Sequence, residues 1–276
     1  MQKISIKSVE DLESELMNYN TLFAYHSNKI ENDEITYHDT RDVFEDGQVR
    51  SFSGSPKTLF MIQNQLDCYH LLKEKIVNKE PITKELIKEM HFELTKGTYD
   101  HKRYFINHER PGEFKKHDYI VGVKEVGCLH EYVDEEIDLL INEIEENKGQ
   151  DPLIVGCYLH AMFENIHPFA DGNGRVGRTL LNYYLLINDV APIVIYENDR
   201  NRYYKCLEAF DEHEDLTPLM QFVEESQKKT WQRDRTTERE HKGLSSQIAR
   251  INLEKANAPV INPNYERANG RNLELN

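Results

Sequence analysis

Twelve consecutive residues, HPFADGNGRVGR from His167 to Arg178, combine a histidine, an aspartate, three glycines and two arginines. Because an imidazole titrates near neutral pH, His167 could accept a proton from an attacking hydroxyl. The Gly172-Asn173-Gly174 segment can turn backbone N–H groups inward as an anion nest at the start of a helix, where the helix dipole also favours negative charge. The stretch therefore predicts a site that binds phosphates and moves a proton.

The two arginines and the aspartate complete this chemistry. Arg175 and Arg178 are three residues apart, so both project from one face of the helix that begins near Arg175 and can bind phosphate oxygens. Asp171 offers the hard carboxylate oxygen that Mg²⁺ prefers when the ion bridges phosphates and keeps several waters. A lone Gly-Asn-Gly turn would indicate only a solvated helix connection, but the density of reactive groups here favours a site.

Two other motifs share letters with this stretch. Gly172, Gly174 and Gly177 spell the G-x-G-x-x-G dinucleotide fingerprint, which must follow a buried strand, whereas a helix-like segment precedes them here. If Asp171 stood at the third position of an EF-hand calcium loop, the first would be Phe169, which has no oxygen ligand. The context therefore excludes both motifs.

The rest of the chain predicts mostly helices, because apolar residues recur at helical spacing. After a first helix over residues 9–25, the pattern breaks at Asn32 and Asp33 and a second helix restarts at Thr36. The other helical segments are residues 58–76, 83–95, 131–146, 153–166, 179–188 and 201–231. Residues 96–127 differ and carry an alternating run from Tyr119 to Val123, which predicts a loop with a small β-hairpin. We expect an all-α fold with an N-terminal segment over residues 1–57, a core domain over residues 58–232 and a polar, partly disordered extension over residues 233–276.

Composition and charge restrict the classes of partner. The chain has 276 residues, of which 38% are hydrophobic and 30% charged, and it has no apolar run of membrane-spanning length. A net charge of −15 would repel a nucleic-acid backbone, so a polyanion site must be local. The opening residues lack the apolar stretch of a secretory signal, and the four scattered cysteines form no C-x-x-C pair. We expect a cytoplasmic protein with reduced thiols that binds neither membrane nor nucleic acid.

The twelve-residue stretch resembles, at every defined position, the HPFx[D/E]GNGRxxR motif of the Fic family. This resemblance implies a helical bundle with a β-hairpin flap over the active site, and transfer of AMP from ATP to a Ser, Thr or Tyr hydroxyl of a protein. It implies that His167 is the general base and Asp171 the Mg²⁺ ligand. The Gly-Asn-Gly segment and Arg175 would cradle the α- and β-phosphates, and Arg178 would contact the γ-phosphate.

At lower specificity the resemblance extends over residues 58–223. GEFKKHDYIVG stands where the family has its flap, which implies target docking along Asp118, Tyr119, Ile120 and Val121. Lys115 or Lys116 stands where many members carry an arginine, and the proline-rich stretch that commonly follows the flap is absent. NRYYKCLEAF resembles a later helix near the nucleotide, so Tyr203 and Tyr204 are either adenine contacts or aromatic core residues.

A short signal far upstream, SNKIEN from Ser27 to Asn32, fits the family's inhibitory pattern [S/T]xxxE[G/N]. Its position resembles the subclass whose autoinhibitory helix is N-terminal. Ser27 and Glu31 are four residues apart on one helix face. We expect Glu31 to form an ion pair with Arg178 where the γ-phosphate would bind; the alternative is a solvated, acidic helix end.

The resemblance thus implies a protein adenylyltransferase that uses ATP and Mg²⁺ and is restrained by Glu31. Its protein target is unknown, and self-modification and homodimer formation are left open. One alternative is transfer of another phosphate-linked group, as in Doc-type relatives, whose motif has lysine where this chain has Gly174. Another is a non-catalytic, nucleotide-sensing interaction module, against which the intact His167 argues.

Overall fold

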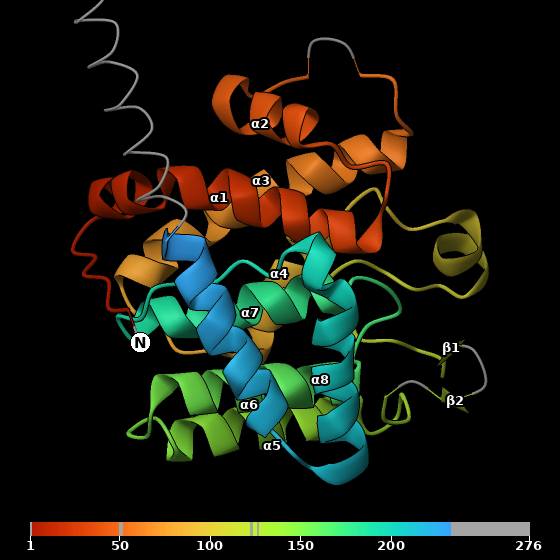
Figure 1. Ribbon diagram of the computed structural model, residues 1–276. Coiled ribbons are helices and arrows are strands. Elements are labelled where there is room, and N and C mark those ends of the chain that lie inside the picture. The colour runs from red at the N-terminus through yellow and green to blue at the C-terminus, as the bar shows by residue number, and fades with distance from the viewer. Residues whose placement is uncertain (1, 50–51, 122–123, 126, 233–276) are drawn as a thin grey trace, which may run out of the picture. The chain divides into compact units, whose positions relative to one another are not determined.

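Two consecutive helices, α6 (Pro152–Ile166) and α7 (Asn173–Ile187), pack against each other and carry the twelve-residue stretch at their junction (Figure 1). The computed structural model describes residues 2–49, 52–121, 124–125 and 127–232. Helix α6 starts where Asp151 accepts a hydrogen bond from the Leu153 N–H, with Pro152 in the first turn. It ends where His167 adopts a left-handed conformation, and α7 starts directly after Gly172, which is also left-handed.

The remaining helices enclose this pair. Helices α1 (Val9–Glu31), α3 (Pro56–Val77) and α4 (Lys84–Thr95) contact α7, whereas α5 (Val133–Glu146) and α8 (Arg200–His213) contact α6. Helix α2 (Tyr37–Asp46) packs on α1 and α3 (Figure 1). A hydroxyl cap begins each of the first four helices, since the side chains of Ser8, Thr36, Ser55 and Thr83 accept a backbone N–H.

Short irregular elements connect the helices. A π-helical turn, η1 (Lys102–Ile106), precedes two strands of two residues each, β1 (Ile120–Val121) and β2 (Lys124–Glu125). The strands are antiparallel, with Ile120 opposite Glu125. A 3₁₀ turn, η2 (Glu197–Asp199), leads into α8, and residues 217–232 are again helical.

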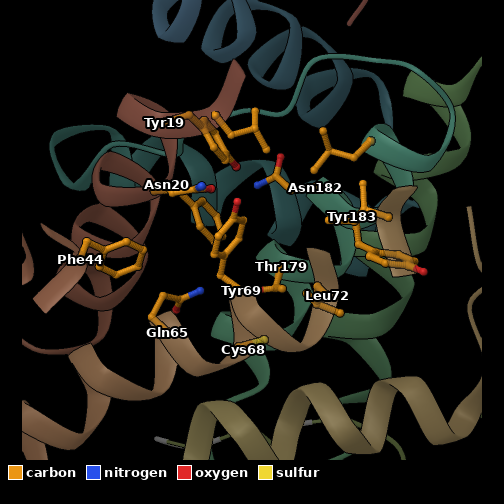
Figure 2. A pocket seen from close by; sticks show the side chains of 14 residues that line it. Tyr19, Asn20, Phe44, Gln65, Cys68, Tyr69, Leu72, Thr179, Asn182 and Tyr183 are labelled. Carbon is orange, nitrogen blue, oxygen red and sulfur yellow. The ribbon is translucent and has the colours of Figure 1, made fainter. Parts of the chain in front are cut away.

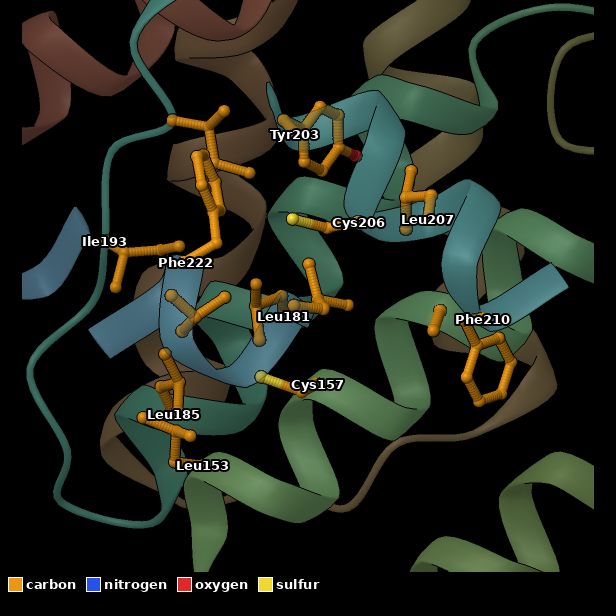
Figure 3. Close-up of a cluster of buried hydrophobic side chains, with 14 of the residues drawn as sticks. Leu153, Cys157, Leu181, Leu185, Ile193, Tyr203, Cys206, Leu207, Phe210 and Phe222 are labelled. Carbon is orange, nitrogen blue, oxygen red and sulfur yellow. The ribbon is translucent and has the colours of Figure 1, made fainter. Parts of the chain in front are cut away.

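One large cluster of buried side chains lies where α6, α7 and α8 meet (Figure 3). It includes Cys157 of α6, Leu181 and Leu185 of α7, and Cys206 and Phe210 of α8. Nearly every side chain of α7 is buried, because helices cover it on several sides. Helix α7 therefore lies at the centre of the described fold.

The mostly helical fold predicted from the sequence is confirmed. Residues 1–230 cluster as one compact unit. The proposed division at residue 57 remains a prediction, and the predicted extension over residues 233–276 lies outside the described residues. Three of the four cysteines are buried and Cys128 is half-buried; all four are free thiols. In the part of the chain that the structure describes, no helix is both long and apolar enough to cross a membrane.

Because α7 is central, truncating one of its buried leucines should destabilise the fold strongly. Leu181 is 0% exposed, whereas Leu139 of α5 is 52% exposed. We expect Leu181→Ala to lower the free energy of unfolding by about 2–5 kcal/mol, and Leu139→Ala to change it by less than about 0.5 kcal/mol. Urea denaturation of both variants measures this difference, and equal effects would contradict the central position of α7.

Candidate active site

His167 is held by the backbone on both sides of it. Its own φ of 52° is unusual for a residue with a side chain, and its N–H donates to the Phe163 carbonyl at 3.0 Å, which closes α6. The Lys115 N–H donates to the Pro168 carbonyl at 2.9 Å, and the Cys128 N–H donates to the Ile166 carbonyl at 3.1 Å. The two ends of the segment that carries β1 and β2 are therefore fastened to the residues on either side of the histidine.

Gly127 makes this close approach feasible. A Cβ atom built at Gly127 would lie 2.5 Å from the His167 Cβ and 2.4 Å from the Ile166 carbonyl oxygen. Its φ is +81°, a conformation that side chains rarely adopt. Only glycine both lacks the clashing Cβ atom and readily adopts this φ.

The surroundings of His167 favour its neutral form. Burial of the ring, followed by the charge of Lys115, lowers its pKa to about 4, against the opposing effects of the Glu164 carbonyl, Glu31 and Asp171. The imidazole is therefore neutral at physiological pH and can accept a proton.

Asn173 stabilises the loop between the two helices with its side chain. Its Nδ2 donates to the Phe169 carbonyl at 2.8 Å, and its Oδ1 accepts from the Phe169 N–H at 2.9 Å. The first backbone bond of α7 runs from the Val176 N–H to the Gly172 carbonyl, so the N–H groups before Val176 have no acceptor within the helix. The predicted phosphate contact at Asn173 and Gly174 can therefore come from the backbone, while the Asn173 amide shapes the loop.

His91, on α4, supports this loop and was missed by the sequence analysis. Its Nδ1 accepts from the Gly112 N–H at 2.8 Å, which leaves Nε2 to donate to the Asp171 carbonyl at 3.0 Å. Its ring stacks on Phe169 at 3.6 Å, and burial lowers its pKa to about 3, so it is neutral. The available signal was its place on the buried face of α4, next to Met90.

The Asp171 carboxylate faces three cationic groups without a close contact to any of them. Lys57 Nζ and Arg175 NH2 lie 3.8 Å away, and Arg103 NH1 lies 4.0 Å away. No three His, Cys, Asp or Glu side chains of the described residues come together as a metal cluster. The accessible carboxylate fits a Mg²⁺ ion whose other ligands are phosphate oxygens and waters.

Both arginines are buried, and each keeps an N–H group without an acceptor among the described residues. Arg175 NH1 donates to the Leu94 carbonyl at 2.8 Å, while its Nε has no partner. Arg178, only 1% exposed, donates from Nε to Ser27 Oγ at 3.1 Å, and its NH1 has no partner. Buried donors without acceptors are costly, so these groups fit a site built for an anion.

The ion pair expected between Glu31 and Arg178 is present. Arg178 NH2 donates to Glu31 Oε1 at 2.8 Å and to the Ser27 carbonyl at 2.8 Å. The same Glu31 oxygen lies 2.5 Å from the position of a Cβ at Gly174. The carboxylate therefore covers both the predicted γ-phosphate partner and the glycine of the predicted nest.

The two candidate adenine contacts differ in exposure. Tyr203 is fully buried in the core cluster, and its hydroxyl lies 2.8 Å from His160 Nε2 (Figure 3). The burial of Tyr203 therefore favours core packing over contact with adenine. Tyr204 is partly exposed, and the Arg200 guanidinium lies 5.6 Å from its ring.

The residues of the predicted flap lie at and within the short hairpin. Asp118 Oδ1 accepts from the His130 N–H at 2.7 Å, and the Tyr119 hydroxyl donates to Glu109 Oε1 at 2.8 Å. Both side chains therefore hold the base of the hairpin. Ile120 and Val121 form β1 itself.

The third glycine of the motif serves packing. A Cβ at Gly177 would lie 2.5 Å from Glu164 Oε1 and 3.0 Å from His160 Nδ1. Burial raises the pKa of Glu164 to about 7. The absence of a side chain at Gly177 therefore lets α7 approach the polar side chains of α6. This packing explains the glycine, so no dinucleotide-binding role is needed to explain it.

Comparisons with known proteins agree with this architecture. Residues 81–185 match the model of the Fic/DOC family. The protein adenylyltransferase Fic of Drosophila virilis is 26% identical over 215 residues, which are 75% of this chain and 41% of that relative. That of Drosophila persimilis is 34% identical over 86 residues, 31% of this chain and 17% of the relative. This chain therefore spans less than half the length of these curated relatives.

Solved structures show the same fold. A Fic domain-containing signalling protein from Bacteroides thetaiotaomicron aligns with a TM-score of 0.65 and 26% identity, covering 76% of this chain and 78% of that chain. Fic-1 from C. elegans aligns with a TM-score of 0.70 and 23% identity, covering 84% of this chain and 71% of that chain.

A side chain at Gly127 should disturb the attachment of the hairpin to His167. We expect Gly127→Ala to lower the free energy of unfolding by at least about 1 kcal/mol, because a Cβ would clash with backbone in a left-handed conformation. Gly149→Ala is the matched control, since a Cβ there meets nothing within 4 Å. Denaturant unfolding measures both variants, and equal stability would contradict the close contact.

Proposed function

We propose that this chain is a protein adenylyltransferase that uses ATP and Mg²⁺, transfers AMP to a Ser, Thr or Tyr hydroxyl of a protein, and is inhibited by Glu31. One observation carries the proposal. A neutral histidine and two buried arginines lie beside the same loop, and each arginine keeps an N–H group without an acceptor among the described residues. The curated relatives named protein adenylyltransferase Fic support the same activity.

In this proposal the chain's residues orient ATP for attack at the α-phosphorus. Backbone N–H groups from Gly172 to Gly174, with Arg175, hold the α- and β-phosphates, and Arg178 holds the γ-phosphate. Asp171 would hold Mg²⁺, which neutralises phosphate charge when bound. Partly exposed Tyr204 is the remaining candidate for the adenine side.

His167 then performs the proton transfer. A ring nitrogen accepts the proton of the target hydroxyl as the hydroxyl oxygen bonds to the α-phosphorus, and the bond from that phosphorus to the bridging oxygen breaks. Diphosphate leaves, and AMP stays on the target. The hairpin of β1 and β2 is the proposed flap, because Lys115 and Cys128 fasten its ends on either side of His167.

Glu31 would oppose this arrangement. A carboxylate and a phosphate cannot share the Arg178 guanidinium without crowding of like charges, so ATP would bind weakly or with its α-phosphate displaced. A displacement of this kind is enough to suppress transfer.

Transfer of another phosphate-linked group is the second candidate. Glu31 Oε1 occupies the space beside Gly174 that a side chain there would need, and the lysine of Doc-type motifs is absent from this position. ATP labelled at the α- or the γ-phosphate separates the two reactions. The protein target, self-modification, a homodimer and a cytoplasmic location stay proposals.

Removing the Glu31 carboxylate should release activity. We expect Glu31→Gly to raise labelling from α-labelled ATP about tenfold or more, because a charge-assisted contact of about 1.5–3 kcal/mol is lost. Arg178→Ala should lower labelling both in the wild type and in the Glu31→Gly variant. The effects of the two substitutions on labelling should not be additive, since both act through one contact.

Two controls make this measurement specific. Glu15→Gly places the same substitution on an exposed position of α1 and should leave labelling near the wild-type level. His167→Ala in the Glu31→Gly background should retain ATP binding but lose about 10²–10⁴-fold in labelling. Faster labelling from γ-labelled ATP than from α-labelled ATP would contradict AMP transfer.

The depressed pKa of His167 predicts the pH dependence of transfer. Protonation removes the base, so activity is lost as pH falls through the pKa, which is about 4 here and about 6.5 for an ordinary histidine. We expect labelling by Glu31→Gly to stay level from pH 8 to about pH 5. Lys115→Met removes a cation that lowers this pKa, so its acidic limb should move to higher pH. If the activity of the Glu31→Gly variant with Lys115 intact already falls near pH 6.5, the lowered pKa of His167 is contradicted.

A further inference from the structure

The segment between α4 and β1, which includes η1, projects on the same side of the helical bundle as the hairpin of β1 and β2 (Figure 1). Arg103 of η1 fastens it to the loop between α6 and α7, because its Nε donates to the Ala170 carbonyl at 3.3 Å. The buried Glu109 carboxylate accepts the Lys116 N–H at 3.0 Å and the Tyr119 hydroxyl at 2.8 Å. The turn η1 and the base of the hairpin are therefore joined to each other and border the candidate active site.

The turn η1 exposes large apolar side chains at this border. Phe105 is 63% exposed and Ile106 is 62% exposed, and the two are neighbours in the chain. The ring of Tyr104, which precedes them, lies 4.0 Å from the Arg110 guanidinium. Apolar side chains that stay exposed next to one another, with polar groups around them, are typical of protein–protein contact sites.

The same segment reverses the sign of the charge. Residues 101–117 contain five lysines and arginines, three histidines and two glutamates, whereas the whole chain has a net charge of −15. One of the two glutamates, Glu109, is buried. The exposed Lys102 has no carboxylate partner among the described residues, and Arg110 donates only to the carbonyls of Tyr104 and Glu109 within that part of the chain. The segment therefore attracts anionic groups.

The cavity between α1, α3 and α7 does not offer a protein target another place to bind (Figure 2). Its volume is about 50 Å³. Since one water needs roughly 10–15 Å³ measured in this way, the cavity has room for a few waters and not for a polypeptide segment. A target that brings a hydroxyl to His167 must therefore dock on the outer surface near that residue.

We propose that the η1 surface, formed by Lys102, Phe105, Ile106 and Arg110, docks an acidic segment of the target protein that carries an apolar side chain. The carboxylates of that segment contact Lys102 and Arg110, and its apolar side chain packs on Phe105 and Ile106. A protein segment is favoured over a nucleic acid, because the net charge of −15 repels a continuous phosphate backbone. The role in transfer rests on the proposed function, whereas the binding of an acidic segment does not.

Binding is measured on the full chain without nucleotide, by fluorescence anisotropy with short labelled peptides. The first peptide has one serine, one leucine and flanking glutamates; the second has lysines in place of the glutamates, and the third has glycine in place of the leucine. We expect the wild type to bind the glutamate peptide about tenfold more tightly than the lysine peptide. Lys102→Glu should lower this ratio about fivefold or more. Lys148→Glu, whose side chain is 72% exposed just after α5, should leave the ratio unchanged.

The apolar contact is tested with Phe105→Ser. This change should weaken binding of the glutamate peptide about fivefold or more but hardly affect the glycine peptide, because removal of either partner abolishes the same contact. Met17→Ser, at a position of α1 that is 68% exposed, is the matched control. Equal affinity for the glutamate and lysine peptides, or equal losses in Phe105→Ser and Met17→Ser, would overturn the assignment. Tighter binding of a single-stranded oligonucleotide with the same number of charges would assign the surface to nucleic acid instead.

The role in transfer is tested by labelling the glutamate peptide with α-labelled ATP in the Glu31→Gly background. Phe105→Ser should raise the KM for the peptide about fivefold or more and leave kcat nearly unchanged, because it removes binding away from the reacting atoms. A fall in kcat at an unchanged KM would refute a docking role. If no peptide is labelled although the glutamate peptide binds, transfer to a serine hydroxyl is contradicted, while the anisotropy measurements still decide the docking surface.

Discussion

The burial of the Arg178 guanidinium is the constraint on which the rest of the structure depends. A cation taken out of water at the centre of a fold must be paired and hydrogen-bonded, because its desolvation is otherwise too costly. Ser27 and Glu31 provide this compensation from the last turns of α1. In the proposed function, the position of α1 and the occupancy of the phosphate cradle are therefore linked, since a phosphate and the Glu31 carboxylate would satisfy the same cation.

The histidine side of the site is organised mainly by backbone. The carbonyls on both sides of His167 accept N–H groups from the base of the hairpin, and Gly127 allows that base to approach. On the other side of the loop, Asn173 and His91 hold Phe169 and the Asp171 carbonyl in place. The reactive side chains are thus positioned by residues that do no chemistry themselves, as a preformed site requires.

The sequence alone predicted that the motif residues lie together, because they all belong to one helix junction, whereas their chemical roles stay predictions. It predicted the Glu31–Arg178 pair only through the resemblance to a family, since 147 residues separate the two partners. His91 was not predicted, because its importance arises from contacts with segments far along the chain. Tyr203 could have been separated from Tyr204 by periodicity alone. Tyr203 shares the face of α8 that carries Cys206, Leu207 and Phe210, whereas Tyr204 does not.

The Glu31 carboxylate belongs to the same chain as the arginine that it contacts, and this has a consequence for regulation. Its effective concentration at Arg178 is fixed by the fold and does not change with the amount of protein present. Dilution therefore cannot relieve the contact as it would relieve contact with a separate inhibitor. Only a competitor for the guanidinium, or a partner that draws α1 away from α7, changes the balance, so the proposed control responds to what binds the protein and not to how much protein there is.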